Sequence, residues 1–128
     1  MTTRSLVARP TTDAGFAGRY VHRDGDPDTQ LQALRHYVTH RHAGDVDAAL
    51  TVLIDDHPFG WVSLPDAEDD GQCFCHGDST LDTGTHTERG SAGGDLEYAY
   101  VLRPDGISVL VPGPGDAWRP LLFAAWTD

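Results

Sequence analysis

The residues best suited to chemistry lie in one short run, from Tyr20 to Pro27, where an imidazole, a guanidinium and carboxylates follow one another. His22 and Asp24 are two positions apart, so on a continuing strand their side chains would share a face. A carboxylate beside an imidazole can orient the ring for general-base catalysis. Arg19 and Arg23 would add positive charge to such a site. We therefore take His22, Asp24, Arg19 and Arg23 as candidate binding residues.

The same run also has a purely structural interpretation. Gly25 can end the strand, because glycine accepts positive φ at no steric cost. Asp26 can cap the free amides of a helix that starts at Pro27. Asp24 would then hold the turn, and His22 would pack beneath the helix start. No Ser or Cys nucleophile is tied to the pair by spacing, so the sequence assigns no reaction and no catalytic residue.

Two other clusters resemble metal sites. Cys73, Cys75 and His76 lie close together, but zinc sites usually use Cys-x-x-Cys loops, and a distant His would have to complete this set. These three residues are metal candidates only on that condition, and we expect no metal and no other cofactor. His36 and His40 have the i, i+4 spacing of a shared metal, yet they lie opposite the apolar stripe of their helix, which indicates a solvent-exposed face.

The elements that must position these residues can be identified from periodicity. Residues 3–9, with the short apolar segment Leu6 to Ala8, and residues 16–23 are predicted as two strands of a hairpin, joined by a polar turn. Two amphipathic helices follow, joined at Gly44, and Asp45 can cap the second. The apolar stripe of the first helix comprises Leu31, Leu34 and Val38, extended by Tyr37. That of the second comprises Val46, Ala49, Leu50, Leu53 and Ile54.

The C-terminal half indicates further strands. Residues 96–102 and 107–111 flank a turn, and the apolar tail 118–126 predicts another strand or a segment packed across the core. Residues 60–64 and 73–75 are short strand candidates. We predict one α+β domain over 1–128, with an antiparallel sheet of about five or six strands, two amphipathic helices packed on one face and a mobile acidic loop at about 65–94. Its large aromatics are expected in the core: Trp61, Tyr98, Tyr100, Trp118 and Trp126.

Charge limits the possible partners. The chain has 128 residues and a formal net charge of −11, made up of +2 over residues 1–44 and −13 over residues 45–128. So acidic a chain is not expected to bind nucleic acid directly, because nucleic-acid binding depends on neutralising phosphates. It could instead bind a basic protein surface, or imitate the phosphate array of DNA. No apolar run reaches the roughly 18 residues needed to span a membrane, and no secretory signal is evident, so we expect a cytoplasmic protein without membrane association.

Five segments of the chain form a recognisable set: the opening Thr3-Arg4-Ser5, the run from Gly18 to Pro27 with its Tyr-x-His-x-Asp-Gly-x-Pro pattern, Gly60-Trp61-x-Ser63-Leu64, the predicted strand from Glu97 to Leu102, and the closing Trp126-x-Asp128. These segments resemble those of a family of small actinobacterial and actinophage proteins. They follow the same order over nearly the whole chain. The resemblance implies a phage or mobile-element context and brings no catalytic residues with it.

Three functions are compatible with these observations. The first, which we favour, is a non-enzymatic acidic interaction protein that binds a host or phage protein. The second is a DNA mimic that inhibits a nucleic-acid-binding enzyme. The third is a small enzyme or ligand-binding domain with a pocket around His22 and Asp24. The sequence does not indicate the oligomeric state.

Overall fold

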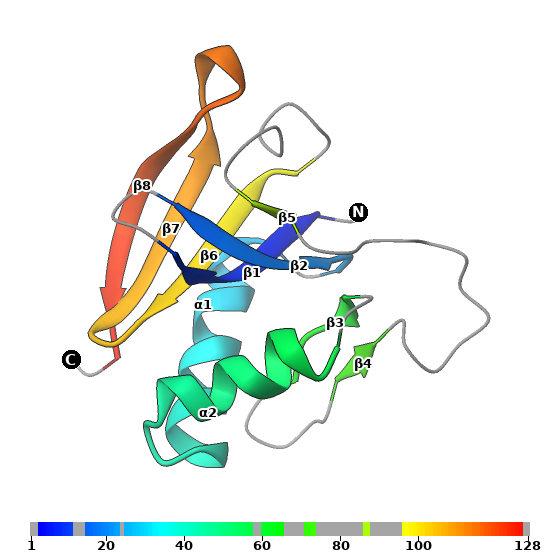
Figure 1. Ribbon diagram of the computed structural model, residues 1–128, viewed down its shortest axis with the longest axis vertical. Coiled ribbons are helices and arrows are strands. Elements are labelled where there is room, and N and C mark those ends of the chain that lie inside the picture. The colour runs from blue at the N-terminus through cyan, green and yellow to red at the C-terminus, as the bar shows by residue number, and fades with distance from the viewer. Residues whose placement is uncertain are drawn as a thin grey trace.

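The protein folds as a single twisted sheet with two helices on one face (Figure 1). The computed structural model describes residues 3–11, 15–23, 25–57, 60–65, 71–73, 86–87 and 96–126. The predicted α+β class is confirmed. Most of the acidic loop expected at about 65–94 lies outside the described residues.

Eight strands form the sheet in the order β4-β3-β2-β1-β6-β7-β8, with β5 paired to β2. Their bounds are β1 Ser5–Pro10, β2 Phe16–Val21, β3 Trp61–Ser63, β4 Gln72–Cys73, β5 His86–Thr87, β6 Tyr98–Arg103, β7 Gly106–Pro112 and β8 Trp118–Ala125. The short strands β4 and β5 bring the count above the expected five or six. The apolar tail is a strand, as predicted, and it ends the sheet at one edge.

The sheet is mixed, whereas the sequence led us to expect antiparallel pairing throughout. The hairpins β1–β2 and β6–β7 are antiparallel, as is β7–β8. Two pairs are parallel, β2 with β3 and β1 with β6. The helices between β2 and β3 carry the chain back to the end of the sheet from which β2 starts, and such a crossover produces a parallel pair. Sequence periodicity identifies strands but not which way the chain returns.

Each helix starts as predicted and continues into a π-helical turn. The helix α1 spans Pro27–His36 and continues as η1, Tyr37–Arg41, while α2 spans Val46–Leu50 and continues as η2, Thr51–Asp55. The carboxylates of Asp26 and Asp45 accept hydrogen bonds from backbone amides in the first turns of α1 and α2. Neither helix, among the residues that the structure describes, is long and apolar enough to cross a membrane.

The main core lies between the helices and one face of the sheet. From the helices, it contains the buried side chains of Leu34, Tyr37, Val38, Ala49, Leu50, Leu53 and Ile54. From the strands, it contains Val7, Val21, Trp61, Tyr100, Leu102, Ile107 and Val109. The predicted stripe of α1 is confirmed at Leu34, Tyr37 and Val38. Leu31 is only half-buried, and Gln30, which the polar pattern would place in solvent, is 2% exposed.

A smaller apolar cluster covers the opposite, helix-free face of the sheet. Its fully buried members are Leu6, Ala8, Phe16, Ala99 and Val101. The ring centroids of Phe16 and Trp118 are 6.0 Å apart, in an edge-to-face contact. Phe16 lies on β2 and Trp118 on β8, which three strands separate in the sheet order. The sheet must therefore curl around this cluster. Figure 1 shows this curl, because β2 runs at a steep angle to β7 and β8.

Leu34→Ala tests the helix–sheet core. The Leu34 side chain is fully buried, so we expect the free energy of unfolding to fall by about 2–5 kcal/mol, from lost burial and the cavity left behind. Gln32→Ala, on the exposed side of the same helix, is the matched control and should stay within about 0.5 kcal/mol of the wild type. Urea denaturation measures both, and equal losses would contradict the placement of α1.

Candidate functional site

The predicted site at His22 is only partly assembled. The Tyr20 hydroxyl and Nδ1 of His22 lie 2.8 Å apart and share a hydrogen bond, and their rings are in contact. The backbone N–H of His22 donates to the carbonyl of Trp61, which extends the pairing between β2 and β3. The half-buried imidazole is therefore held by its own strand. Asp24, the carboxylate expected beside it, lies outside the described residues.

The two arginines predicted for this site point elsewhere. Arg19 lies on the helix-facing side of β2, because it pairs with Val7, whereas Tyr20 pairs with Leu6 on the opposite face. Its Nε–H donates to the carbonyl of Ile54 at 3.0 Å, near the end of η2. The side chain of Arg23 is exposed, and its backbone N–H donates to Val62. The described candidates thus divide between two faces of the sheet.

Below this turn, β1, β6 and the start of α1 meet at Gly25. The backbone N–H of Gly25 donates to the carbonyl of Thr3 at 3.1 Å, and the buried Tyr100 hydroxyl donates to the carbonyl of Gly25. A Cβ at position 25 would lie 2.6 Å from the Thr3 carbonyl oxygen and 2.8 Å from Oγ of Ser5, so only glycine fits without a shift of the backbone. The turn is a tightly packed structural joint.

Two polar side chains are buried in this part of the core. Oγ of Ser5 and Nε2 of Gln30 have no hydrogen-bond partner among the described residues. Ser5 begins β1, and Gln30 lies in the first turn of α1. A buried unsatisfied polar group costs about 1–3 kcal/mol of folding free energy. The contact between the start of α1 and the sheet is therefore less stable than it would be with apolar side chains at these two positions.

The metal candidates lie almost entirely outside the described residues. Cys75 and His76 lie outside them, and of Cys73 only the backbone is described, where it pairs with Trp61. Within the described ranges, no group of three or more His, Cys, Asp or Glu side chains could hold a metal ion. His36 and His40 are exposed, as predicted, and their rings are 5.7 Å apart.

The acidic side chains that the structure describes are spread over several elements. Asp45 and Asp47 lie at the start of α2, and Asp55 lies at the end of η2, where it forms a 2.9 Å ion pair with Arg9. Glu97 and Asp105 lie beyond the two ends of β6. These described carboxylates belong to several different elements.

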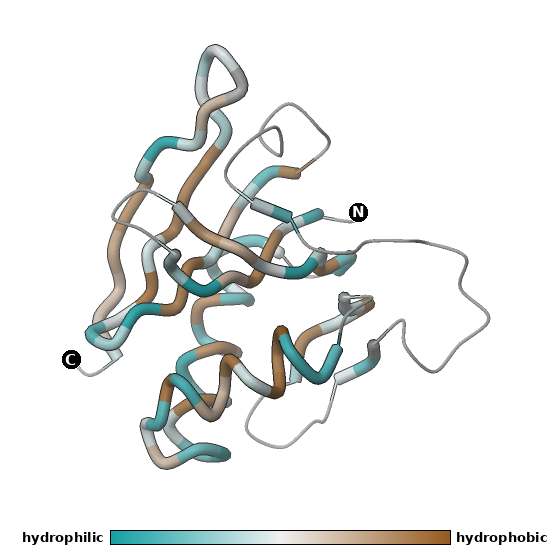
Figure 2. Tube along the Cα trace, viewed as in Figure 1, coloured by the Kyte–Doolittle hydropathy of each residue, from teal (hydrophilic) through white to brown (hydrophobic). Residues whose placement is uncertain are grey.

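A hollow lies on the helix-free face beside β8, the strand that carries the largest exposed apolar side chains of the described residues. Leu121, Leu122 and Phe123 are 50%, 41% and 51% exposed. The hollow, which we call the β8 hollow, has a volume of about 440 Å³ and is lined by Arg103, Ser108, Leu110, Trp118, Pro120, Leu121, Leu122 and Phe123. Figure 2 shows apolar residues along β8, the strand at one edge of the sheet.

The free edge of β8 is poorly suited to pairing with another strand. Val109 pairs with Leu122, and Leu110 with Pro120, so Leu121 is an extra residue in a β-bulge. Proline and bulges on an edge strand disrupt further strand addition. Side chains in the β8 hollow, rather than backbone hydrogen bonds, are therefore the means of contact that this edge offers.

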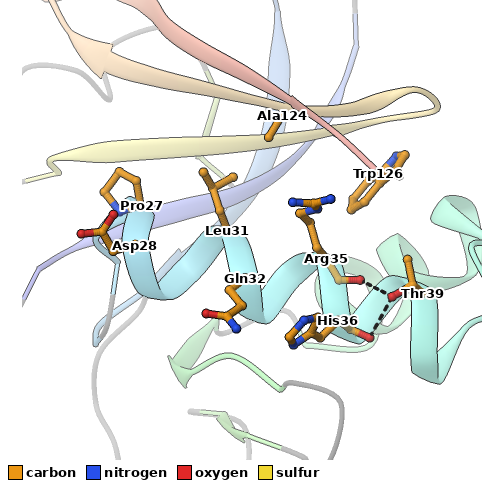
Figure 3. Close-up of a pocket in the computed structure, with 9 residues that line it drawn as sticks. All are labelled: Pro27, Asp28, Leu31, Gln32, Arg35, His36, Thr39, Ala124 and Trp126. Atoms are coloured by element: carbon orange, nitrogen blue, oxygen red, sulfur yellow. Dashed lines mark hydrogen bonds between the residues drawn. The ribbon is translucent and has the colours of Figure 1, made fainter. Parts of the chain in front are cut away.

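A second depression, the α1–β8 groove, lies on the other side of β8. It has a volume of about 530 Å³ and is lined by Pro27, Asp28, Leu31, Gln32, Arg35, His36, Thr39, Ala124 and Trp126. Leu31 and Arg35 point from α1 towards β8, where Ala124 and Trp126 face them, and His36 points the other way (Figure 3).

The walls of the groove are fixed by hydrogen bonds. The indole Nε1–H of Trp126 donates to the carbonyl of Arg103 at 2.7 Å. The Thr39 hydroxyl donates to the carbonyl of Arg35 at 2.7 Å, at the junction where α1 becomes the π-helical η1 (Figure 3). Since that hydroxyl is engaged with the helix backbone, the groove offers a cation, a carboxylate and an aromatic face, but no activated nucleophile.

Neither depression was predicted from the sequence. Trp126 was expected in the core, and it does pack against the core, yet it also lines the groove. The sequence signal that could have indicated an exposed apolar surface was the uncharged run from Pro120 to Trp126. An edge strand cannot bury both of its faces, so part of such a run must stay exposed.

Comparisons of the chain with known proteins found no matching family model, no matching curated protein and no matching solved structure.

Tyr100→Phe tests the joint at Gly25. Loss of the hydroxyl leaves the Gly25 carbonyl without this buried donor, so we expect the free energy of unfolding to fall by about 1–3 kcal/mol. Tyr98→Phe, in the half-buried ring next to it, is the control and should cost less than half as much. Chemical denaturation at neutral pH compares them, and equal costs would contradict the role of the Tyr100 hydroxyl.

Alkaline pH provides an independent test of the same contact. Burial raises the pKa of Tyr100 well above its ordinary value, and the nearby Tyr98 and the Asp26 and Asp28 carboxylates add to the effect. The unfolded chain loses this proton near pH 10 and the folded chain does not, so the contribution to stability is complete below about pH 10 and declines above it. Unfolding free energies from pH 8 to 11 should fall less steeply for Tyr100→Phe. Parallel curves would contradict the burial of this hydroxyl.

Proposed function

We propose that the protein is a non-enzymatic interaction protein of phage or mobile-element type that binds a host or phage protein through the β8 hollow. The observation that carries the proposal is the exposure of Leu121 and Phe123 on the edge strand β8. Leu122 is exposed as well, but it pairs with Val109 of the helix-side core, so its side chain points to the other face. Contiguous exposed apolar surface on a small domain is characteristic of interaction sites. The resemblance to actinobacterial and actinophage proteins supports the phage context. We also propose a cytoplasmic location, as the sequence led us to expect.

The chemistry of the hollow and of the whole chain defines the partner. Half-exposed Leu and Phe side chains beside Trp118 suit an apolar anchor from the partner. A net charge of −11 favours a partner with a basic surface, which long-range attraction would steer towards this domain. Because Pro120 and the bulge at Leu121 impede strand pairing, we place the contact on the face of β7 and β8.

The enzyme alternative has less support. His22 shares its Nδ1 with the Tyr20 hydroxyl, and Arg19 lies on the other face of the sheet. Neither described depression is lined by His22. The DNA-mimic alternative requires carboxylates at phosphate-like spacing on one face, and the described carboxylates belong to several elements.

Phe123→Asp tests the proposed interface. Immobilised wild type, Phe123→Asp and Gln72→Asp are exposed to the same actinobacterial extract at low and high salt. Gln72 is an exposed residue on β4, at the opposite edge of the sheet, and is the matched control. We expect one defined protein to be retained by the wild type and by Gln72→Asp, and its retention to fall at least tenfold with Phe123→Asp and at high salt.

The comparison is informative because Phe123 is half-exposed, so an Asp there should leave the fold intact, as far-UV circular dichroism can verify. Equal retention of the captured protein by Phe123→Asp and wild type would contradict the proposed surface. Loss with Gln72→Asp alone would move the interface to the opposite edge.

A further inference from the structure

A single cation lies in the otherwise uncharged β8 hollow. Of the described residues that line the hollow, Arg103 alone is charged. The net charge of the chain is −11, yet Arg103 forms no ion pair with any carboxylate among the described residues. The guanidinium is therefore a positive charge that this part of the chain leaves unpaired, at the surface proposed for protein binding.

A hydrogen bond to Ser108 orients the guanidinium. Ser108 pairs with Val101, two residues before Arg103, so the side chains of Ser108 and Arg103 lie on the helix-free face of β6 and β7. The Nε–H of Arg103 donates to Oγ of Ser108 at 3.0 Å. The two Nη atoms have no hydrogen-bond partner among the described residues. Their N–H groups are therefore available to a ligand, in a position that is already fixed.

An exposed aromatic ring lies next to the guanidinium. Phe123 pairs with Ser108 from the other side of β7, so its side chain is on the same face. A Cβ at Gly106 would lie 2.6 Å from the outer end of the Phe123 ring, and Gly106 is the residue that pairs with Arg103. The ring therefore reaches over β7 towards β6. Two N–H donors and an apolar ring that is 51% exposed are thus brought together by three neighbouring strands.

We propose that Arg103 binds a carboxylate of the partner protein, from an Asp or Glu side chain that lies beside the partner's apolar anchor. The two Nη–H groups donate in parallel to the two carboxylate oxygens, while the anchor covers Phe123. This inference rests on the interface proposed for the β8 hollow and names the residue type that the interface recognises. The surrounding surface of the partner is basic, which the net charge of the chain favours.

The donors in the hollow favour a carboxylate over other anions. One guanidinium with two available donors matches the two oxygens of a carboxylate, whereas recognition of a phosphorylated side chain uses a cluster of arginines. A nucleic-acid backbone would meet a strongly acidic domain. Small-molecule sites enclose most of their ligand, whereas Leu121 and Phe123 in this hollow are half-exposed. A polypeptide segment can cover both side chains.

Titration with two capped peptides tests the proposal. Acetyl-Lys-Leu-Glu-Phe-Lys-amide places a carboxylate beside apolar residues, and the same peptide with Gln in place of Glu is more positive by one charge. Non-specific attraction to an acidic chain would favour the Gln peptide, so the two mechanisms predict opposite orders of affinity.

In ¹H–¹⁵N spectra of the whole protein, we expect the Glu peptide to bind about tenfold more tightly than the Gln peptide and to shift the Nε–H signal of Arg103. Equal affinities, tighter binding of the Gln peptide, or no shift with the Glu peptide would overturn the proposal.

Three variants assign this preference to Arg103. Arg103→Gln should abolish the preference for the Glu peptide, and Arg103→Lys, which keeps the charge but lacks the planar pair of donors, should restore only part of it. Arg119→Gln removes the same charge from an exposed arginine of β8 that does not line the hollow, and this control should keep the full preference. Circular dichroism verifies that each variant is folded. Full preference with Arg103→Gln, or equal losses with Arg103→Gln and Arg119→Gln, would overturn the proposal.

The titration needs no captured protein, so its outcome is separate from that of the proposed function. A captured protein that Phe123→Asp releases, but that Arg103→Gln retains as well as the wild type does, would support the interface and overturn the carboxylate contact. A preference for the Glu peptide without any captured protein would support the carboxylate contact and contradict the proposed function.

Discussion

The close contact between Gly25, Thr3 and Tyr100 determines where the first helix begins. The Gly25 amide donates to the carbonyl of Thr3, just before β1, and the Gly25 carbonyl accepts a hydrogen bond from the hydroxyl of Tyr100 on β6. These contacts leave no room for a Cβ at position 25. Because Asp26 and Pro27 start α1 immediately afterwards, the joint fixes that helix against the sheet. The groove between α1 and β8 is a consequence of this placement.

The two faces of the sheet differ in how completely they are covered. The helices bury one face, and the stability of the fold depends mainly on that core. The curled, helix-free face buries Phe16 and its neighbours near the centre, but its apolar surface continues to β8 and ends exposed at Phe123. This exposed apolar surface is the basis of the protein interface that we propose.

Local signals in the sequence predicted the local structure well. Asp26, Pro27 and Asp45 mark the helix starts, and Leu34 and Val38 mark the buried stripe, because capping and helical periodicity act over a few residues. The hairpin turn at residues 103–106 was equally clear.

Features that depend on distant contacts could not be predicted in the same way. Gln30 is buried although it is polar, and the parallel pairing of β1 with β6 depends on the path of the whole chain. The aromatic and apolar residues of β8 were expected to be covered, but their exposure follows from the place of that strand at the edge of the sheet. His22 was predicted within a compact cluster, yet strand alternation directs Arg19 to the other face.

The central claim is that this domain binds a protein partner through the face of β7 and β8. Hydrogen–deuterium exchange of the domain, alone and with the captured partner, tests it most directly. The account predicts slower exchange on binding over residues 106–112 and 118–125, with the turn at residues 22–25 unchanged. Protection confined to that turn, with β7 and β8 unaffected, would contradict it.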